Sequence, residues 1–125
     1  MLAELHVELV AADRKVWSGD ATIVVARTAS GDVGIMAGHT PLLSVLESDP
    51  VTIRTTDGGT VVAAVHGGFI TFSDNKLSIL AEIAELAEEI DVERAERALQ
   101  RAKSETDGAA QRRADVRLRA VAGAR

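Results

Sequence analysis

The fold is decided by the stretch Val51-Thr52-Ile53-Arg54-Thr55-Thr56-Asp57-Gly58-Gly59-Thr60-Val61-Val62-Ala63-Ala64-Val65. Both halves are rich in β-branched residues, which pack well on the pleated surface of a sheet. Between the halves stands Asp57-Gly58-Gly59, and turns of this composition are typical of β-hairpins. The stretch therefore predicts two antiparallel strands, at residues 51–55 and 60–65, joined by a tight turn.

Short strands continue in both directions from this hairpin. Leu5, Val7 and Leu9 alternate with polar residues, as in a strand with one buried face. Further strands are predicted at residues 21–28, 33–36, 42–46, 69–72 and 76–80, with turns at residues 18–20, 30–32 and 74–75 and a break at Gly67-Gly68. Many short strands without intervening helices predict a β-sandwich, in the form of a flattened antiparallel barrel.

The periodicity changes after residue 82, where alanine, glutamate and arginine become frequent. Asp91 is a good N-cap residue for a helix, and residues 105–108 interrupt the helical pattern. Apolar residues recur at helical spacing in two stripes: Val92, Ala95, Leu99 and Ala102, then Ala110, Ala114, Leu118 and Val121. Two helices joined by a short turn predict an antiparallel helical hairpin.

Two domains follow from this change: an N-terminal β-sandwich at residues 1–86 and a C-terminal helical hairpin at residues 87–125. Of the charged side chains, residues 1–90 contain five basic and thirteen acidic ones, and residues 91–125 contain nine and six. The two parts therefore carry opposite net charge, which suggests two roles or two partners. Alanine buries little area at about 25 cal/mol per Å². We therefore expect a weakly held hairpin that can detach or extend.

The sequence predicts no catalytic residue and no metal site. Cysteine is absent, which excludes thiolate catalysis and Cys-type zinc sites. Neither a phosphate-binding loop nor a nucleophile elbow is present. His6, His39 and His66 are isolated in the sequence, and an enzyme built on their convergence would need a metal or a measurable turnover. His39, in a loop after a strand, fits a loop-bracing role or a binding role.

The charged residues of the C-terminal part allow two interpretations. Arg94, Arg97 and Arg101 share one helix face, and facing arginines can bind phosphates. A solvated face with pairs such as Glu93 and Arg97 is the simpler interpretation. The acidic cluster at residues 82–89 is explained by the dipole of the following helix. Nucleic-acid binding is not expected from an acidic chain, and no apolar run predicts direct membrane insertion or a signal peptide.

Three motifs resemble a known family. They are Ser30-Gly31-Asp32-Val33-Gly34-Ile35-Met36-Ala37-Gly38-His39-Thr40-Pro41-Leu42-Leu43, Val65-His66-Gly67-Gly68-Phe69 and Val16-Trp17-Ser18-Gly19. Their order and spacing resemble those of the epsilon subunits of bacterial rotary (F-type) ATP synthases. The resemblance covers nearly the whole chain and implies a β-sandwich followed by an antiparallel helix pair.

The resemblance also implies partners. In the family, the sandwich contacts the gamma subunit and the ring of membrane-embedded c subunits, and the C-terminal helices reach the alpha/beta catalytic head. The residues predicted to contact the c-ring and gamma are Ser30, Gly31, Asp32, His39 and Pro41. Asp32 would suit basic polar loops of the ring.

Some bacterial members bind ATP in the hairpin through the pattern I/L-D-x-x-R-A, which Ile90-Asp91-Val92-Glu93-Arg94-Ala95 matches. The resemblance implies ATP-binding roles for Glu85, Ile90, Asp91, Arg94, Ala95, Arg101 and Arg119. The second helix stops near Arg125, earlier than in many members, and Arg119 is the nearest counterpart of their second-helix arginines. Mg-ATP is therefore predicted as a regulatory ligand, and no cofactor is required.

The resemblance implies a non-catalytic central-stalk subunit of a proton-translocating ATP synthase. Such a subunit couples c-ring rotation to the gamma shaft and restrains ATP hydrolysis through its C-terminal helices, while catalysis resides in other subunits. It is peripheral, at the cytoplasmic face of the plasma membrane. The alternative is a free-standing nucleotide-sensing or adaptor β-sandwich, which would form no stable complex with gamma.

Overall fold

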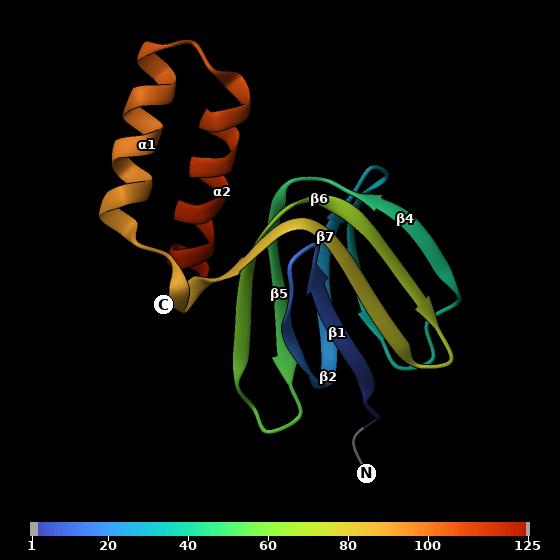
Figure 1. Ribbon diagram of the computed structural model, residues 1–125. Helices are drawn as coiled ribbons and strands as arrows, with labels where there is room; N and C mark the ends of the chain where they lie inside the picture. The colour runs from blue at the N-terminus through green and yellow to red at the C-terminus, as the bar shows by residue number, and fades with distance from the viewer. Residues whose placement is uncertain (1–2, 125) are drawn as a thin grey trace.

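The computed structural model describes residues 3–124, in which strands are followed by a helical hairpin (Figure 1). The strands are β1 Leu5–Ala11, β2 Arg14–Thr28, β3 Gly31–Met36, β4 Leu42–Leu46, β5 Asp49–Thr55, β6 Thr60–Ser73 and β7 Lys76–Leu86. The helices are the short 3-10 helix η1 Ala87–Glu89, α1 Val92–Ser104 and α2 Gly108–Gly123. Met1, Leu2 and Arg125, at the outer ends of the two predicted domains, lie outside the described residues.

The strands close into a flattened barrel. β1 pairs antiparallel with β2 and parallel with β7. β6 pairs with β7 on one side and with β5 and then β4 on the other, and β5 pairs in turn with β2. The path β1–β7–β6–β5–β2 therefore returns to β1, and the predicted sandwich in flattened-barrel form is confirmed.

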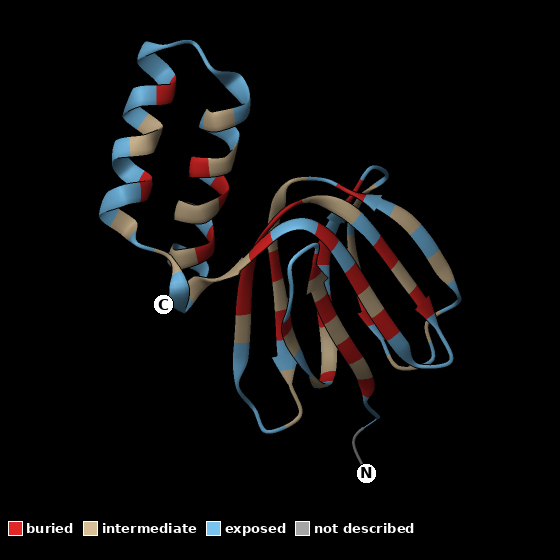
Figure 2. Cartoon of the chain, in the orientation of Figure 1, coloured by how far each residue is buried: buried red, intermediate tan, exposed pale blue. Residues whose placement is uncertain are grey.

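The interior is aliphatic, as the near absence of aromatic residues requires. Leu5, Val7 and Leu9 are at most 1% exposed, and buried and half-buried residues alternate along β1. The same banding is visible on the other strands in Figure 2. Side chains from six further strands complete this core, including Val24, Ile35, Leu46, Ile53, Ile70 and Ile79.

The turn predicted at residues 18–20 is wrong. Those residues lie inside β2, where Gly19 pairs with Val7 of β1, and the chain reverses at residues 12–13 instead. The ring of Trp17 explains the glycine, because a Cβ at Gly19 would lie 2.8 Å from it. Gly19 therefore makes room for an aromatic side chain on a continuous strand.

The break predicted at Gly67-Gly68 is a bend within one strand. β6 continues through both glycines, pairing with β5 up to Val65 and with β4 from Gly68 onward. Core residues are Ala63 and Val65 before the bend and Ile70 and Phe72 after it, so the inward–outward alternation shifts by one residue. Gly67 and Gly68 have φ angles of +73° and +132°, which favour glycine.

Both other hairpin predictions are confirmed. β5 and β6 pair from Asp49 with Val65 to Arg54 with Thr60, around the turn that contains Asp57. β6 and β7 meet at Asp74 and Asn75, whose φ angles of 52° and 58° match the two-residue hairpin turn with positive φ at both positions.

The helices begin at aspartate caps. Asp91 accepts a hydrogen bond from the Arg94 amide and Asp107 from the Ala110 amide, each at 3.1 Å, so the predicted cap at Asp91 is confirmed. Ala95, Ala102 and Ala114 are buried, as the alanine stripes predict.

α2 also buries a second face that the stripes did not reveal. Val116 and Ala120 pack with Val62 and Ala64 of β6. α2 therefore stands between the strands and α1, which packs mainly on α2 (Figure 1). Among residues 3–124, no helix has the length and apolar character needed to cross a membrane.

The bend at Gly68 yields a stability prediction. A Cβ there would lie 2.1 Å from the Leu80 carbonyl oxygen, so we expect Gly68→Ala to lower the free energy of unfolding by about 3 kcal/mol or more. Gly58→Ala is the matched control, because Gly58 also has a positive φ but meets no atom within 4 Å; it should cost about 1 kcal/mol. Urea titration measures both. Equal costs would contradict the steric role of Gly68.

Candidate functional site

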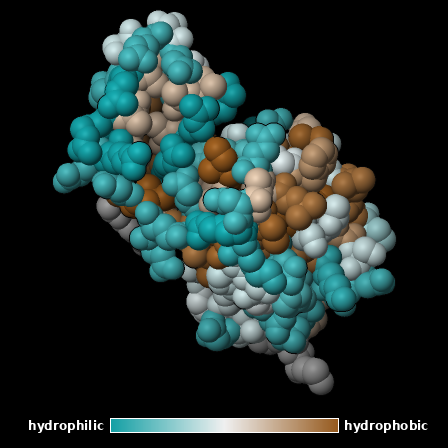
Figure 3. Space-filling model, viewed as in Figure 1, coloured by the Kyte–Doolittle hydropathy of each residue, from teal (hydrophilic) through white to brown (hydrophobic). Residues whose placement is uncertain are grey.

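An exposed apolar strip crosses three strands of the sandwich. Val45 of β4 pairs with Phe69 of β6, which pairs with Leu80 of β7. Leu43, two residues before Val45, lies on the same face of β4. These four side chains are 51–73% exposed, and Figure 3 shows hydrophobic residues gathered over this side of the sandwich. We call Leu43, Val45, Phe69 and Leu80 the apolar strip.

Contiguous exposed apolar side chains on a sheet mark an interaction surface more often than single ones do. The pattern was available in the sequence, because residues 42–46 carry apolar side chains at both odd and even positions. Leu46 fills the core, so Leu43 and Val45 must face outward. The inward alternation of the strands alone does not predict this strip.

The hairpin is joined to the sandwich by arginine–carboxylate pairs. Arg117 of α2 donates from Nε to Oε1 of Glu85 on β7 at 2.7 Å. Arg119 donates from Nη1 to Asp49 of β5, also at 2.7 Å, and from Nε to Asp115 on its own helix at 2.9 Å. α2 is thereby fixed to two strands by side chains two residues apart.

A third pair ties the connection between sandwich and hairpin. Arg14, at the start of β2, contacts both carboxylate oxygens of Glu89 in η1 at 3.0 and 3.2 Å. Forked pairing of this kind fixes orientation as well as distance. The acidic cluster at residues 82–89 therefore has a role beyond the helix dipole, since Glu85 and Glu89 each meet an arginine distant in the sequence.

His66 completes the junction. It is 5% exposed, and its Nε2 lies 3.3 Å from the same Glu85 oxygen that Arg117 contacts. Hydrogen bonds from His66 and Arg117 to the charged carboxylate hold the pKa of Glu85 at about 2, against the opposing effect of its partial burial. Glu85 is therefore ionised at neutral pH.

The residues predicted to bind ATP fall into two groups. Glu85 and Arg119 form the pairs just described, and Ile90 packs beside Val62 and Ala64.

The second group lies at α1. Asp91 serves as the cap of this helix and Ala95 is buried. Arg94 and Arg101 are exposed on the same helix, and neither guanidinium has an ion-pair partner within residues 3–124.

The residues predicted to contact gamma and the c-ring also form two sets, one at each end of β3. Ser30, Gly31 and Asp32 lie at the start of β3, whereas His39 and Pro41 follow its end. Six strand residues span roughly 20 Å, so the two sets occupy opposite ends of the sandwich. Asp32 is exposed and lies 3.8 Å from Arg27.

The loop after β3 is braced from inside. Gly38 donates its amide hydrogen to Asn75 Oδ1 at 2.8 Å, and the His39 ring stands edge-on to Phe72 with centroids 5.9 Å apart. His39 Nδ1 also lies 2.7 Å from the Thr40 carbonyl oxygen. These contacts agree with the loop-bracing interpretation of His39 and leave the neighbouring Leu43 free at the surface.

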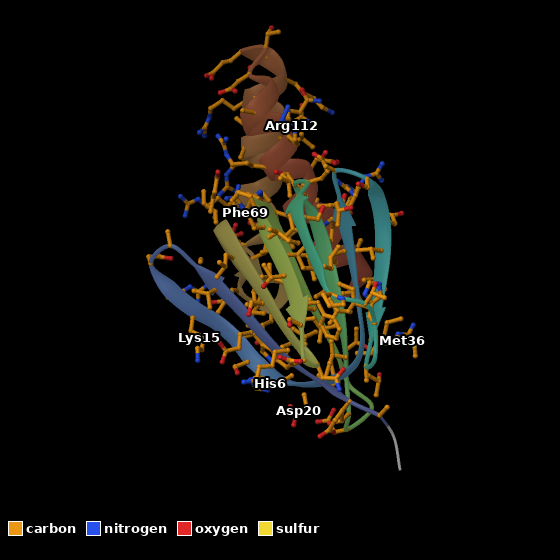
Figure 4. The ribbon with its side chains drawn as sticks, turned by 90° about the vertical axis from the view of Figure 1, so that its right-hand side faces the viewer. His6, Lys15, Asp20, Met36, Phe69 and Arg112 are labelled. Carbon is orange, nitrogen blue, oxygen red and sulfur yellow. The ribbon has the colours of Figure 1, made fainter. Side chains whose placement is uncertain are left out.

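The three histidines do not converge. Figure 4 shows His6 beside Asp20, 3.1 Å away, at the end of the sandwich opposite the helices. His66 lies at the hairpin junction and His39 in the loop after β3. Among residues 3–124, no group of three or more His, Asp or Glu side chains has the arrangement of a metal site.

Comparison with known proteins gives a consistent result. The family model described as ATP synthase, Delta/Epsilon chain, beta-sandwich domain matches residues 4–87. An ATP synthase epsilon chain of Streptomyces griseus is 80% identical over 122 residues, covering 98% of each chain. Another, of Rhodococcus jostii, is 50% identical over 121 residues, covering 96% of this chain and 98% of that protein.

Solved structures resemble the fold. A chain of the Euglena gracilis mitochondrial ATP synthase, in a structure of OSCP, F1 and c-ring, matches 96% of this chain and 78% of its own length, with a TM-score of 0.75 and 23% identity. A chain from the central stalk and c-ring of the Tetrahymena thermophila enzyme matches 93% and 95%, with a TM-score of 0.59 and 17% identity. At these sequence identities, both matches show a shared fold.

The Glu85 junction predicts a pH-dependent hairpin. The pKa of Glu85 is lowered from 4.5 to about 2. The contribution of Glu85 to the attachment of the hairpin is therefore complete above pH 4.5 and is lost as the pH falls toward 2. Glu85→Gln should lower the free energy that holds the hairpin on the sandwich by about 2 kcal/mol at neutral pH, because solvent only partly screens the charge of Glu85. Hydrogen exchange of α2 amides should accelerate about 30-fold.

Glu88→Gln is the matched control, because Glu88 is exposed in η1 and makes no ion pair in the described part of the chain. It should leave α2 exchange unchanged. If both variants behave alike at neutral pH, or if acid does not release α2 in the unaltered protein, the junction does not hold the hairpin.

Proposed function

Because the chain belongs to the family of ATP synthase epsilon chains, we propose that it is a non-catalytic subunit of the central stalk of that enzyme. Catalysis then resides in other subunits. The observation that carries this proposal is the apolar strip, whose four exposed side chains are contiguous on neighbouring strands and suit a stable protein partner.

The gamma subunit is the partner proposed for the strip. Phe69 supplies a half-exposed aromatic ring at its centre, and buried aromatic anchors dominate the binding energy of many interfaces. The loop with His39 and Pro41 leads directly into Leu43, so it extends the same contact. Its bracing by Asn75 and Phe72 keeps this part of the surface rigid, which reduces the entropy lost on docking.

The c-ring is the partner proposed for the opposite end of β3. There the turn with Ser30 and Gly31 presents the exposed carboxylate of Asp32, which suits basic polar loops. One rigid sandwich that touches both gamma and the ring would transmit rotation between them. The protein would thus lie peripherally at the cytoplasmic face of the plasma membrane.

The hairpin is proposed as the regulatory part. Arg117 and Arg119 hold α2 against the sandwich in the observed state. Their release would free both helices to extend toward the alpha/beta head, where the basic side chains could restrain ATP hydrolysis. A population of extended hairpin requires only that the docking free energy be a few kcal/mol.

Mg-ATP is proposed to bias this equilibrium through α1. Arg94 and Arg101 are exposed and free to meet phosphates, which arginine binds well. Glu85 is already bound by Arg117 and His66, so its use by a nucleotide would require a rearrangement of the junction.

The strip gives the test of the stalk assignment. Phe69→Asp should weaken binding to purified gamma by about 30-fold, because it places a charge in an apolar contact. Val25→Asp is the control, since Val25 is 42% exposed on β2, away from the strip. Isothermal titration measures both. An unaltered chain that forms no complex with gamma would instead favour the free-standing adaptor.

The nucleotide role is tested on α1. NMR titration of the whole chain with Mg-ATP should shift amides near Arg94 and Arg101, and Arg94→Gln with Arg101→Gln should weaken binding about tenfold or more. These changes are cleaner than Asp91→Ala, which removes a cap worth about 1 kcal/mol. Lys103→Gln is the control, because Lys103 is exposed on the opposite side of α1. Absence of any shift with the unaltered chain would rule out ATP as the regulator.

A further inference from the structure

A small polar hollow lies where the start of α2 meets the bend of the sandwich. It has a volume of about 160 Å³, enough for several water molecules at about 30 Å³ each. The hollow is lined by Ser48, before β5, His66 and Gly67 at the β6 bend, Glu82 and Ile83 of β7, and Ala109, Arg112 and Arg113 of α2.

We infer that this hollow binds a small phosphate-class oxyanion, held by Arg112 and Arg113 of α2 together with the hydroxyl of Ser48. None of these residues belongs to the predicted ATP motif on α1. A ligand site of this kind does not depend on which subunits the chain contacts.

Within residues 3–124, the two arginines are not engaged in any other contact of their charged groups. Arg117 and Arg119, one and two turns further along α2, are committed to Glu85 and Asp49. Arg112 and Arg113 form no ion pair or side-chain hydrogen bond with any residue from 3 to 124. Figure 4 shows Arg112 on the hairpin, close above the sandwich. Two adjacent unpaired guanidinium groups at a concave surface attract oxyanions.

His66 supplies the second, independent observation. His66 lines the hollow and is 5% exposed. Nε2 faces Glu85, and the other nitrogen, Nδ1, is buried without a hydrogen-bond partner. Buried polar atoms in proteins are nearly always satisfied. Because Nε2 donates to Glu85, Nδ1 of the neutral ring is an acceptor, and the hydroxyl of a hydrogen phosphate ion, or a water molecule held in the hollow, would satisfy it.

The start of α2 adds a weaker attraction. Ala109 lies in the first turn of a 16-residue helix, where backbone amides lack helical partners and the dipole favours negative charge. Asp107 already caps the Ala110 amide, so the arginines must supply most of the affinity.

Glu82 is the one acidic group in the lining, and it opposes an anion. Its carboxyl group lies against the bend, 3.6 Å from the position of a Cβ on Gly67. With two arginines and one glutamate, the lining still has an excess of positive charge. Glu82 therefore tunes the affinity downward without reversing the preference, and its removal should strengthen binding.

A bound oxyanion would bridge the hairpin and the sandwich. Arg112 and Arg113 belong to α2, whereas Ser48 and His66 belong to the strand region. A ligand held by both parts binds the docked hairpin better than the detached one, and so stabilises docking by mass action. The ligand in the hollow would therefore hold the hairpin on the sandwich in addition to the arginine–carboxylate pairs.

The test is an NMR titration of the full chain with inorganic phosphate, at constant ionic strength maintained with chloride. Saturable shifts should centre on the amides of Ser48, Gly67 and Ala109 and on the His66 ring. Arg112→Gln with Arg113→Gln should weaken binding about tenfold or more. Glu82→Gln should strengthen it about threefold, the effect of one nearby charge screened by water.

Arg97→Gln with Lys103→Gln is the matched control, because it removes the same charge from α1 and leaves the hollow intact. An equal loss in this control would reveal general attraction to a basic hairpin and would overturn the site. So would the absence of saturable shifts at millimolar phosphate in the unaltered chain.

A second titration, with AMP, distinguishes the source of the oxyanion. If AMP shifts the same amides at lower concentration, the phosphate is recognised on a nucleotide. If only inorganic phosphate shifts them, the ligand is the free ion. Both results support an oxyanion site, and neither depends on binding to gamma.

Discussion

The backbone of Gly68 approaches the carbonyl of Leu80 so closely that no side chain fits between them. The positions of the apolar strip and of the strand surface beneath α2 both depend on this approach. At this point β6 leaves β5, joins β4 and shifts its alternation by one residue. Before the bend, the outward residues Val62, Ala64 and His66 lie beneath α2. After it, Phe69 and its neighbour Leu80 remain open. The pair of strands β6 and β7 thus contacts α2 before the bend and carries part of the apolar strip after it.

The sequence predicted the fold well wherever a local rule was strong. Hairpins at Asp57-Gly58-Gly59 and Asp74-Asn75, the cap at Asp91 and the alanine stripes all follow from interactions within a few residues. The errors at Gly19 and at Gly67-Gly68 share one cause. Glycine signals a turn when only its neighbours are considered, but here it makes room for a ring or a carbonyl that tertiary packing brings close.

The junction could be predicted only in part, because its members are distant in the sequence. The excess of acidic residues in the strands and of basic residues in the helices indicated only that the two parts differ in net charge, which suggested two roles or two partners. It could not reveal that Glu85 meets Arg117 or that Asp49 meets Arg119, since these pairings depend on the docking of α2. His66 carried no signal at all. The family resemblance proposed roles for Glu85 and Arg119, whereas the fold gives each an arginine–carboxylate contact.

The order in which the last elements pack has a consequence for how the molecule comes apart. α1 rests mainly on α2, and within residues 3–124 α2 is the helix that packs extensively on the strands, so the arrangement is a series of supports. In a series, the outer member cannot be held more firmly than the inner one. A change that weakens the contact of α2 with the strands therefore releases α1 equally often, although α1 itself has gained and lost no contact. Natural variation on the outer face of α1 can alter what that helix meets without altering how often it is set free.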